Sequence, residues 1–351
     1  MALYVDIEKK LGDFIMRVKF EAADEIFAIL GASGCGKSMT LKCIAGIERP
    51  DRGRIVLDRK VLFDSEKHID VPVKKRKVGY LFQDFALFPN MTVLQNICCG
   101  IRGKREERRK AAKEFIKRFY LEGVEDHYPW QLSGGQKQRV AMARMLAAEP
   151  DILMFDEPFS ALDNYLKWQL EQEIMEVLSR FGKTALFVSH DRNEVYRLTD
   201  RIAVMEEGSL VDIKDKKSLF ADPGSLAATL LTGCKNITLI ERQDDGRFYA
   251  VDWGIFLKSD RSLEKIKYVG FRAHYFEPVA ETGAENVVEC EVMKVIEDTF
   301  SMIVLFRQKQ NPREGDWSAL RYELPKEKWK QLKDRKLFLK LPEDKLILME
   351  K

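Results

Sequence analysis

One eight-residue stretch limits the possible folds of this chain more than any other, because it fits the pattern G-x-x-x-x-G-K-[ST]. It follows an apolar run at residues 26–30 and leads into a helical pattern at residues 39–45. Three glycines let the backbone turn tightly and direct successive N–H groups at anionic oxygens, and the N-terminus of a following helix adds positive partial charge. The sequence therefore predicts a phosphate-binding loop between a strand and a helix. Its residues are Gly31, Ala32, Ser33, Gly34, Cys35, Gly36, Lys37 and Ser38.

Two side chains of this phosphate loop have distinct expected roles. Lys37 would reach the β- and γ-phosphates of a nucleoside triphosphate, and the Ser38 hydroxyl would ligate Mg²⁺. The loop thus predicts binding of a nucleotide such as ATP together with Mg²⁺.

Composition limits the class of protein. The 351 residues are 45% apolar and 33% charged, which suits two globular domains with a large core. A net charge of +3 gives no case for a nucleic-acid partner. There is no run of eighteen apolar residues and no signal-peptide pattern at the start, so we expect the chain to stay in the cytoplasm.

The six cysteines lack Cys-x-x-Cys spacing, which favours free thiols. The adjacent Cys98 and Cys99 are expected to fill a helical core.

The pattern of elements predicts an α/β domain followed by a smaller β-rich one. Short strands dominate up to about residue 85, and a helical insertion follows at about residues 86–145, with Thr92 as the cap of one helix. Apolar strands then alternate with helices, which argues for a parallel sheet covered on both faces. We expect a nucleotide-binding domain over residues 1–233 and a β-rich domain over residues 234–351.

Polar side chains follow three predicted strands and are candidates for catalysis. Asp156 and Glu157 end an apolar strand, where Asp156 would contact Mg²⁺ and Glu157 would polarise an attacking water. His190 follows another strand and could donate a hydrogen bond to the γ-phosphate. Gln83 follows a third and could ligate Mg²⁺ through its amide oxygen. Strand ends of a parallel sheet face the ligand crevice, so these residues are expected to meet there.

The segment at residues 132–139 narrows the kinds of nucleotide-binding protein that this chain can be. It reads Leu-Ser-Gly-Gly-Gln-Lys-Gln-Arg. Together with the phosphate loop, Gln83, Asp156, Glu157, residues 160–163 and His190 in this order, the chain resembles the ATPase subunits of ATP-binding-cassette (ABC) transporters. The resemblance covers about the first 230 residues and implies a P-loop NTPase cassette with a β-subdomain, a parallel-sheet core and a helical subdomain.

The resemblance also implies that a second copy completes the site. In the family, the segment corresponding to residues 133–136 faces the γ-phosphate held by a partner's phosphate loop, so two ATP molecules lie in a head-to-tail homodimer. Asp163 would link the two sites, and Gln83 would couple the core to the helical insertion. Residues 85–89 would receive a short helix of an integral-membrane permease. The residues of the second anion site are Ser133, Gly134, Gly135 and Gln136.

Two positions near the nucleotide depart from the family or stay open. Met39 stands where the family usually has a small hydroxyl residue, although the phosphate contacts come from the backbone and Ser38. Phe14 is the candidate for stacking on adenine, with Leu11 as an alternative, and a core phenylalanine is an equal interpretation of Phe14.

One cassette followed by a β-rich domain resembles the ATPase of a binding-protein-dependent importer, peripheral on the cytoplasmic face of the membrane. Residues 232–237 and 270–275 resemble the molybdate, tungstate and sulfate group, and residues 286–351 resemble its barrel-like (TOBE/Mop-like) regulatory module. Residues 284–286 stand in place of the oxyanion-binding Ser-x-Arg-Asn of such modules, and Arg272 or Lys294 is a candidate for holding an oxyanion. Uptake of sulfate, iron, polyamine or sugar is the alternative. A soluble cassette ATPase would need two cassettes or a long coiled coil, and a P-loop kinase would not need residues 132–136.

Overall fold

The computed structural model describes residues 2–160, 164–243, 246–281, 283–309 and 319–350. Packing divides the chain into two units, Met1–Lys216 and Lys217–Lys351. This division lies before the boundary predicted after residue 233. The buried guanidinium of Arg272 accounts for the difference, because it donates hydrogen bonds to the carbonyl oxygens of Phe220 (2.6 Å) and Thr232 (2.9 Å) and so ties the preceding helical segment to the C-terminal strands.

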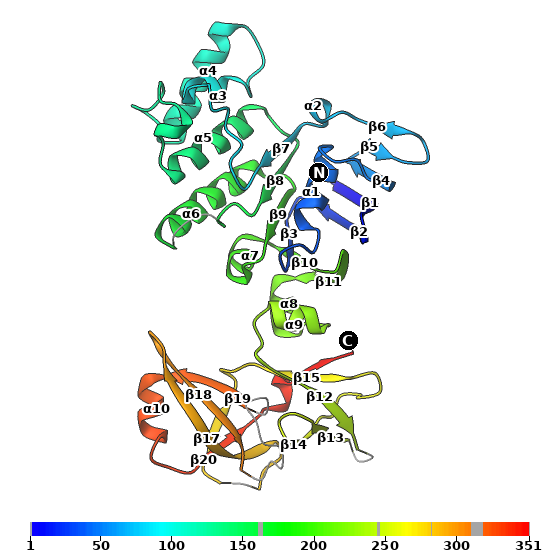
Figure 1. The fold of residues 1–351 in the computed structure, drawn as a ribbon, viewed down its shortest axis with the longest axis vertical. Coiled ribbons are helices and arrows are strands. Elements are labelled where there is room, and N and C mark those ends of the chain that lie inside the picture. Colours follow the sequence, from blue (N-terminus) through cyan, green and yellow to red (C-terminus); the bar gives the residue numbers. More distant parts are fainter. Residues whose placement is uncertain (1, 161–163, 244–245, 282, 310–318, 351) are drawn as a thin grey trace. The chain divides into compact units, whose positions relative to one another are not determined.

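The first unit is built on an eleven-stranded sheet with the order β6-β5-β4-β1-β2-β11-β10-β3-β9-β8-β7 (Figure 1). The strands from β10 to β7 run parallel, whereas the pairs around β1 are antiparallel. Both β8 and β9 are buried at every residue, which is expected of parallel strands covered on both faces. The strands are β1 (Ala2–Leu11), β2 (Phe14–Ala23), β3 (Ile26–Gly31), β4 (Arg52–Leu57), β5 (Lys60–Asp64), β6 (Ile69–Asp70), β7 (Val78–Leu81), β8 (Ile152–Asp156), β9 (Ala185–Ser189), β10 (Arg201–Glu206) and β11 (Ser209–Asp215).

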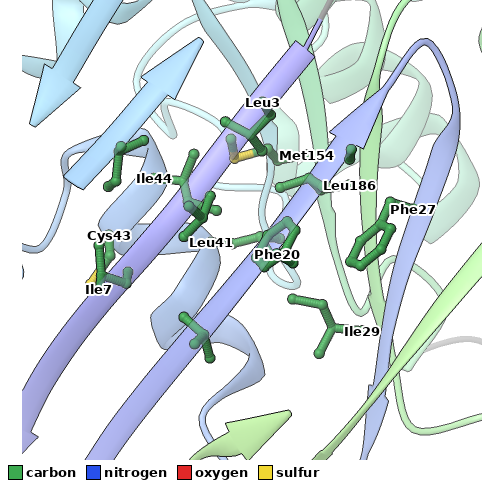
Figure 2. Close-up of a cluster of buried hydrophobic side chains, with 14 of the residues drawn as sticks. Leu3, Ile7, Phe20, Phe27, Ile29, Leu41, Cys43, Ile44, Met154 and Leu186 are labelled. Carbon is green, nitrogen blue, oxygen red and sulfur yellow. The ribbon is translucent and has the colours of Figure 1, made fainter. Parts of the chain in front are cut away.

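The helix that follows the phosphate loop, α1 (Lys37–Ala45), is embedded in the main core of this unit. Its Leu41 and Ile44 are fully buried. Figure 2 shows them among apolar side chains of β1 and β2 and of the parallel strands, with Met154 from β8 and Leu186 from β9 in the same cluster. Burying side chains of this size stabilises the fold by about 1.5–3 kcal/mol each. The base of the phosphate loop is therefore fixed by the core.

The predicted helical insertion is present and packs beside β7 (Figure 1). The prediction that Thr92 caps a helix is confirmed, because its hydroxyl accepts a hydrogen bond from the N–H of Gln95. The last helix of the insertion begins at Gly134, since the hydroxyl of Ser133 caps it and offsets the low helix propensity of two glycines. The helices of the first unit beyond α1 are α2 (Val73–Arg76), α3 (Val93–Cys98), α4 (Arg105–Arg118), α5 (Gly134–Ala147), α6 (Asn164–Phe181) and α7 (Arg192–Leu198), with a 3-10 turn at Pro129–Gln131.

The second unit contains two antiparallel five-stranded sheets that share one core, as expected of a β-rich domain. Their orders are β14-β13-β12-β15-β21 and β16-β20-β17-β18-β19. The last strand pairs with β15, so residues 286–351 do not form a sheet of their own. The elements are α8 (Lys216–Ala221), α9 (Leu226–Leu231), β12 (Asn236–Arg242), β13 (Arg247–Ala250), β14 (Ile255–Lys258), β15 (Tyr268–Phe271), β16 (Glu277–Val279), β17 (Val287–Glu297), β18 (Ser301–Gln308), β19 (Leu320–Pro325), α10 (Lys326–Leu332), β20 (Leu337–Lys340) and β21 (Ile347–Met349).

The six cysteines are free thiols, as predicted. The expectation that Cys98 and Cys99 fill a helical core is wrong for the second of them. Cys99 lies just past the end of α3 and is exposed, and Cys98 is only half-buried, because the core-facing residues of this short helix are Leu94 and Ile97.

Candidate active site

The phosphate loop leaves no room for a side chain at two of its three glycines, Gly31 and Gly36. A Cβ atom on Gly31 would lie 2.6 Å from both the sulfur of Cys35 and the carbonyl oxygen of Met205. Gly36 has a φ of 110°, which side chains other than glycine rarely adopt, and a Cβ there would meet the side chain of Met205 at 2.7 Å. The loop is thus a tight backbone turn held against β10, with its N–H groups available to an anion.

Lys37 lies buried at the mouth of the loop. Its Nζ donates hydrogen bonds to the carbonyl oxygens of Gly31 and Ala32, each at 2.9 Å, and lies 3.5 Å from Glu157 Oε1. The ammonium is therefore fixed between the phosphate loop and the acidic end of β8. A fixed cation beside exposed N–H groups is suited to polyanionic phosphate.

Ser38 and Asp156, which are 118 positions apart in the chain, meet at hydrogen-bond distance. The Ser38 hydroxyl donates to Asp156 Oδ1 at 2.7 Å, and the Tyr80 hydroxyl from β7 donates to Oδ2, also at 2.7 Å. Burial, the charge of Asp156 and this hydrogen bond all raise the pKa of Tyr80, so the phenol remains a proton donor. A hydroxyl beside an oriented carboxylate supplies the hard oxygen ligands that Mg²⁺ prefers.

Replacing Tyr80 with phenylalanine should weaken the proposed binding of Mg²⁺ without disturbing the fold. Phenylalanine keeps the ring, which packs 4.3 Å from that of Phe82, but removes the donor that orients Asp156. The loss of such a supporting partner typically costs at least tenfold in metal affinity, so the Mg²⁺ concentration for half-maximal ATP turnover should rise about tenfold. A Mg²⁺ titration measures it, and an unchanged Mg²⁺ requirement would show that Tyr80 does not support the carboxylate.

Glu157 and His190 face each other across two neighbouring strands. The Oε2 atom of Glu157 lies 3.1 Å from Nδ1 of His190, whose side chain is about 50% exposed. Their backbones are also linked, because the N–H of Glu157 donates to the carbonyl oxygen of Val188 at 3.0 Å in β9. Glu157 itself has a φ of 46°, an uncommon value that turns its carboxylate away from the strand direction. The pair offers a carboxylate and an imidazole at the open side of the site.

The start of α5 is capped by reciprocal hydrogen bonds. The Ser133 hydroxyl accepts a hydrogen bond from the N–H of Gln136, and the Gln136 side chain accepts one from the N–H of Ser133. Gly134 and Gly135, which follow the cap, add no side chains to this first turn, whose N–H groups carry positive partial charge. Within the described part of the chain, no hydrogen bond or ion pair joins residues 133–136 to the phosphate loop.

The first unit matches the family model for ABC transporters over residues 16–160. The chain is 39% identical to the molybdenum import ATP-binding protein ModC of Paramagnetospirillum magneticum over 305 residues, which cover 84% of each chain. The chain belongs to the ABC transporter family.

Other comparisons agree with this family. The iron import ATP-binding protein FbpC of Haemophilus influenzae is 39% identical over 212 residues, and the match spans 60% of each of the two chains. A dimeric structure of a post-hydrolysis state of the ATP-binding cassette MJ0796, bound to ADP and Pi, superimposes on this ABC cassette with a TM-score of 0.52. It is 33% identical, and the match covers 62% of this chain and 99% of that one.

The remaining predicted residues lie in different settings within the ABC cassette. Gln83 is exposed two residues after β7, and its side chain makes no hydrogen bond to any described residue. Met39 and Phe14 are partly buried against the main core. Asp163 lies outside the described residues.

Phe14 packs beside the turn that closes the phosphate loop. Its ring lies next to Gly208, where an added Cβ would meet it at 3.1 Å, and the N–H of Gly208 donates to the carbonyl oxygen of Cys35 at 3.1 Å. The exposed neighbours Leu11 and Ile15 flank it on the same hairpin.

Sequence reasoning missed one residue that organises the surface near Gln83. Arg144 of α5 donates hydrogen bonds to the carbonyl oxygens of Phe85 (3.1 Å) and Ala86 (2.8 Å), and its guanidinium lies 5.2 Å from the ring centroid of Phe88. This ties residues 85–88 to the helix that Ser133 caps. Nothing in the local sequence marks Arg144, since its partners are nearly sixty positions away.

Among the described helices, none is long and apolar enough to cross a membrane.

Proposed function

We propose that this chain binds ATP with Mg²⁺ at the phosphate loop and hydrolyses it. One observation carries the proposal: Lys37, the Ser38–Asp156 pair and the Glu157–His190 pair come together at the carboxyl ends of the adjacent strands β3, β8 and β9. Membership of the ABC transporter family supports it.

Each of these groups has a part in the proposed reaction. The N–H groups of the phosphate loop and Lys37 hold the phosphates, which aligns the terminal phosphorus for attack. Ser38 and Asp156 would hold Mg²⁺, which neutralises phosphate charge when bound. Glu157 accepts a proton from the attacking water, and His190 orients that water and the phosphate through hydrogen bonds.

We further propose that two copies form the working unit, head to tail. The capped start of α5 is the second anion-binding surface, and no hydrogen bond or ion pair among the described residues joins it to the phosphate loop of the same copy. Its residues are Ser133, Gly134, Gly135 and Gln136. A second copy would bring its own α5 start to the phosphates, and Asp163 would connect the two sites. ATP would then bind the closed pair better than the open one, which shifts the population toward closure.

The proposed role of this cycle is solute uptake. The relatives ModC and FbpC are named as import ATP-binding proteins. By analogy, the chain would sit on the cytoplasmic face of the membrane against permease subunits, which in turn receive solute from an extracytoplasmic binding protein. Residues 85–89 are the proposed permease contact, with Phe85 and Ala86 held by Arg144, and Gln83 beside them would report the nucleotide state.

For the solute we propose an oxyanion such as molybdate or tungstate, with iron or another solute as the alternative. The relative named for molybdenum matches through most of the chain, whereas the equally identical one named for iron matches over 60% of it. The second unit gives this choice no support of its own. The buried guanidinium of Arg272 donates hydrogen bonds to backbone carbonyl oxygens. The side-chain amide of Asn286 exchanges two hydrogen bonds with the backbone of Lys258.

Affinity purification tests the transport role. A tagged chain carrying Glu157→Gln would be isolated from native membranes in mild detergent with ATP, and its partners identified by mass spectrometry. We expect a multispanning permease near one-to-one stoichiometry, and a molybdate-type permease would support the oxyanion. Only soluble or ribosomal partners would contradict the transport role while leaving ATP hydrolysis untouched.

A further inference from the structure

A lysine on α6 bridges two carboxylates beside the catalytic histidine. The Nζ of Lys167 lies 2.5 Å from Asp191 Oδ2 and 2.6 Å from Glu194 Oε1. Glu194 is almost fully buried, and the Lys167 side chain is only 20% exposed. Burial alone would lower the pKa of Lys167, but the hydrogen bonds to the two carboxylates raise it, so the ammonium stays charged.

The same carboxylates fix the residues on both sides of His190. The Ser189 hydroxyl donates to Glu194 Oε2 and accepts a hydrogen bond from the N–H of Asp191 at 2.9 Å. Asp191 in turn caps α7, because its Oδ1 accepts from the N–H of Asn193 at 2.8 Å. His190 is thus the middle residue of a three-residue segment whose two ends are bound to one polar cluster.

We infer that Lys167 is a positioning residue for His190: by bridging Asp191 and Glu194 it holds residues 189–191 so that the imidazole faces Glu157. The inference rests on the proposed ATP hydrolysis. Lys167 lies in the first turn of α6, immediately after the segment that contains Asp163, so it joins the start of that helix to the histidine segment. No contact between Lys167 and His190 is needed for this effect.

Removing the ammonium would leave two carboxylates facing each other without their shared cation. Like charges at this distance repel, and one of the two, Glu194, cannot reach water because it is buried. Asp191 would be pushed outward and would carry the backbone of His190 with it. A displacement of about 1 Å at a catalytic group can cost up to about 100-fold in rate.

The same two helices supply a matched control pair. Arg197 of α7 makes a bidentate ion pair with the buried Glu171 of α6, at 2.6 and 2.8 Å. This pair also joins α6 to α7, and neither of its side chains forms a hydrogen bond or ion pair with residues 189–191, although the charges of Asp191 and Glu194 act on Arg197 at longer range. If tying the helices together were the only effect of Lys167, breaking the Arg197 pair would change catalysis in the same way.

The test compares Lys167→Met, Lys167→Arg and Arg197→Met in the full chain. We expect Lys167→Met to lower kcat for ATP about tenfold with the ATP dissociation constant unchanged within about twofold, because binding groups are not displaced. Arginine can bridge two carboxylates, so Lys167→Arg should restore most of the rate. Arg197→Met should lower the melting temperature but leave kcat within about twofold of the original value.

A double-mutant cycle with His190→Ala decides the route of the effect. If Lys167 acts through His190, adding Lys167→Met to His190→Ala should lower kcat by less than about twofold more. Equal loss of kcat in both backgrounds, or equal loss in Lys167→Met and Arg197→Met, would overturn the inference. If the unaltered chain hydrolyses no ATP, the proposed function fails instead, so the two failures are distinguishable.

Asp191→Asn provides a second route should Lys167→Met not fold. The asparagine keeps an oxygen to cap α7 but loses the charge that pairs with Lys167. We expect a smaller fall in kcat, about threefold, which again disappears in the His190→Ala background. A normal kcat for a folded Asp191→Asn chain, with its ion pair gone, would count against the inference.

Discussion

Replacing Glu157 with glutamine should lower the turnover of ATP by about 10²–10⁴-fold, the usual contribution of a general base. Glutamine has the same shape but cannot accept the proton of the attacking water. ATP should still bind, since the phosphate loop, Lys37 and the Ser38–Asp156 pair are unchanged. Phosphate release under steady-state conditions measures the rate, and equilibrium binding of ATP measures the affinity.

Asp151 provides the matched control for this substitution. It immediately precedes β8 at the end opposite to Glu157, and its nearest cations, Lys77 and Lys183, lie 4.0 Å away. Asp151→Asn removes a carboxylate of the same strand region and should leave turnover within about twofold, as is usual for a surface charge. A Glu157→Gln chain that turns over ATP as fast as the Asp151→Asn chain would exclude Glu157 as the base.

Replacing Arg76 with methionine should destabilise the first unit by about 3–5 kcal/mol, the usual cost of leaving the partners of a buried charge unpaired. The side chain is fully buried, and it donates to the carbonyl oxygens of Cys43 (3.0 Å), Ile44 (2.8 Å) and Val71 (2.6 Å) and to Asp70 Oδ1 (2.9 Å). Two of these carbonyl groups belong to the last turn of α1. The melting temperature should therefore fall by about 10 °C.

Arg49 allows a direct comparison, because it pairs with the other oxygen of the same carboxylate. Its Nε lies 3.6 Å from Asp70 Oδ2, but its side chain is 69% exposed. Exposed pairs contribute about 0–1 kcal/mol, so Arg49→Met should shift the melting temperature by no more than about 3 °C. Similar shifts for Arg49→Met and Arg76→Met, measured by calorimetry, would mean that the buried hydrogen bonds of Arg76 do not hold α1.

The predictable parts of the site are those that depend on residues close together in the sequence. The phosphate loop needs glycines at fixed spacing, and Asp156, Glu157 and His190 follow apolar strands directly, so the strand pattern alone indicated a common edge. Thr92 as a cap was predictable for the same reason, since capping involves neighbours three residues apart.

The parts that were not predictable depend on pairings over long distances in the chain. Arg76 lies in a run of four basic residues, which is typical of a solvated surface, yet it is buried beneath α1. Tyr80 is 76 positions from Asp156, and Lys167 is 24 from Asp191. No local pattern distinguishes such residues from ordinary strand or helix residues, because their roles arise only when the sheet brings the elements together.

The central claim, that two copies complete each other's ATP sites, is tested most directly by mixing two inactive variants. Lys37→Ala should disable the phosphate loop, and Ser133→Arg should block the start of α5, so each alone should hydrolyse little ATP. In a mixed pair, the intact phosphate loop of one copy meets the intact α5 start of the other. If the sites act independently, the mixture should recover up to about one quarter of the original activity. A mixture no more active than the average of the two variants alone would contradict the shared site.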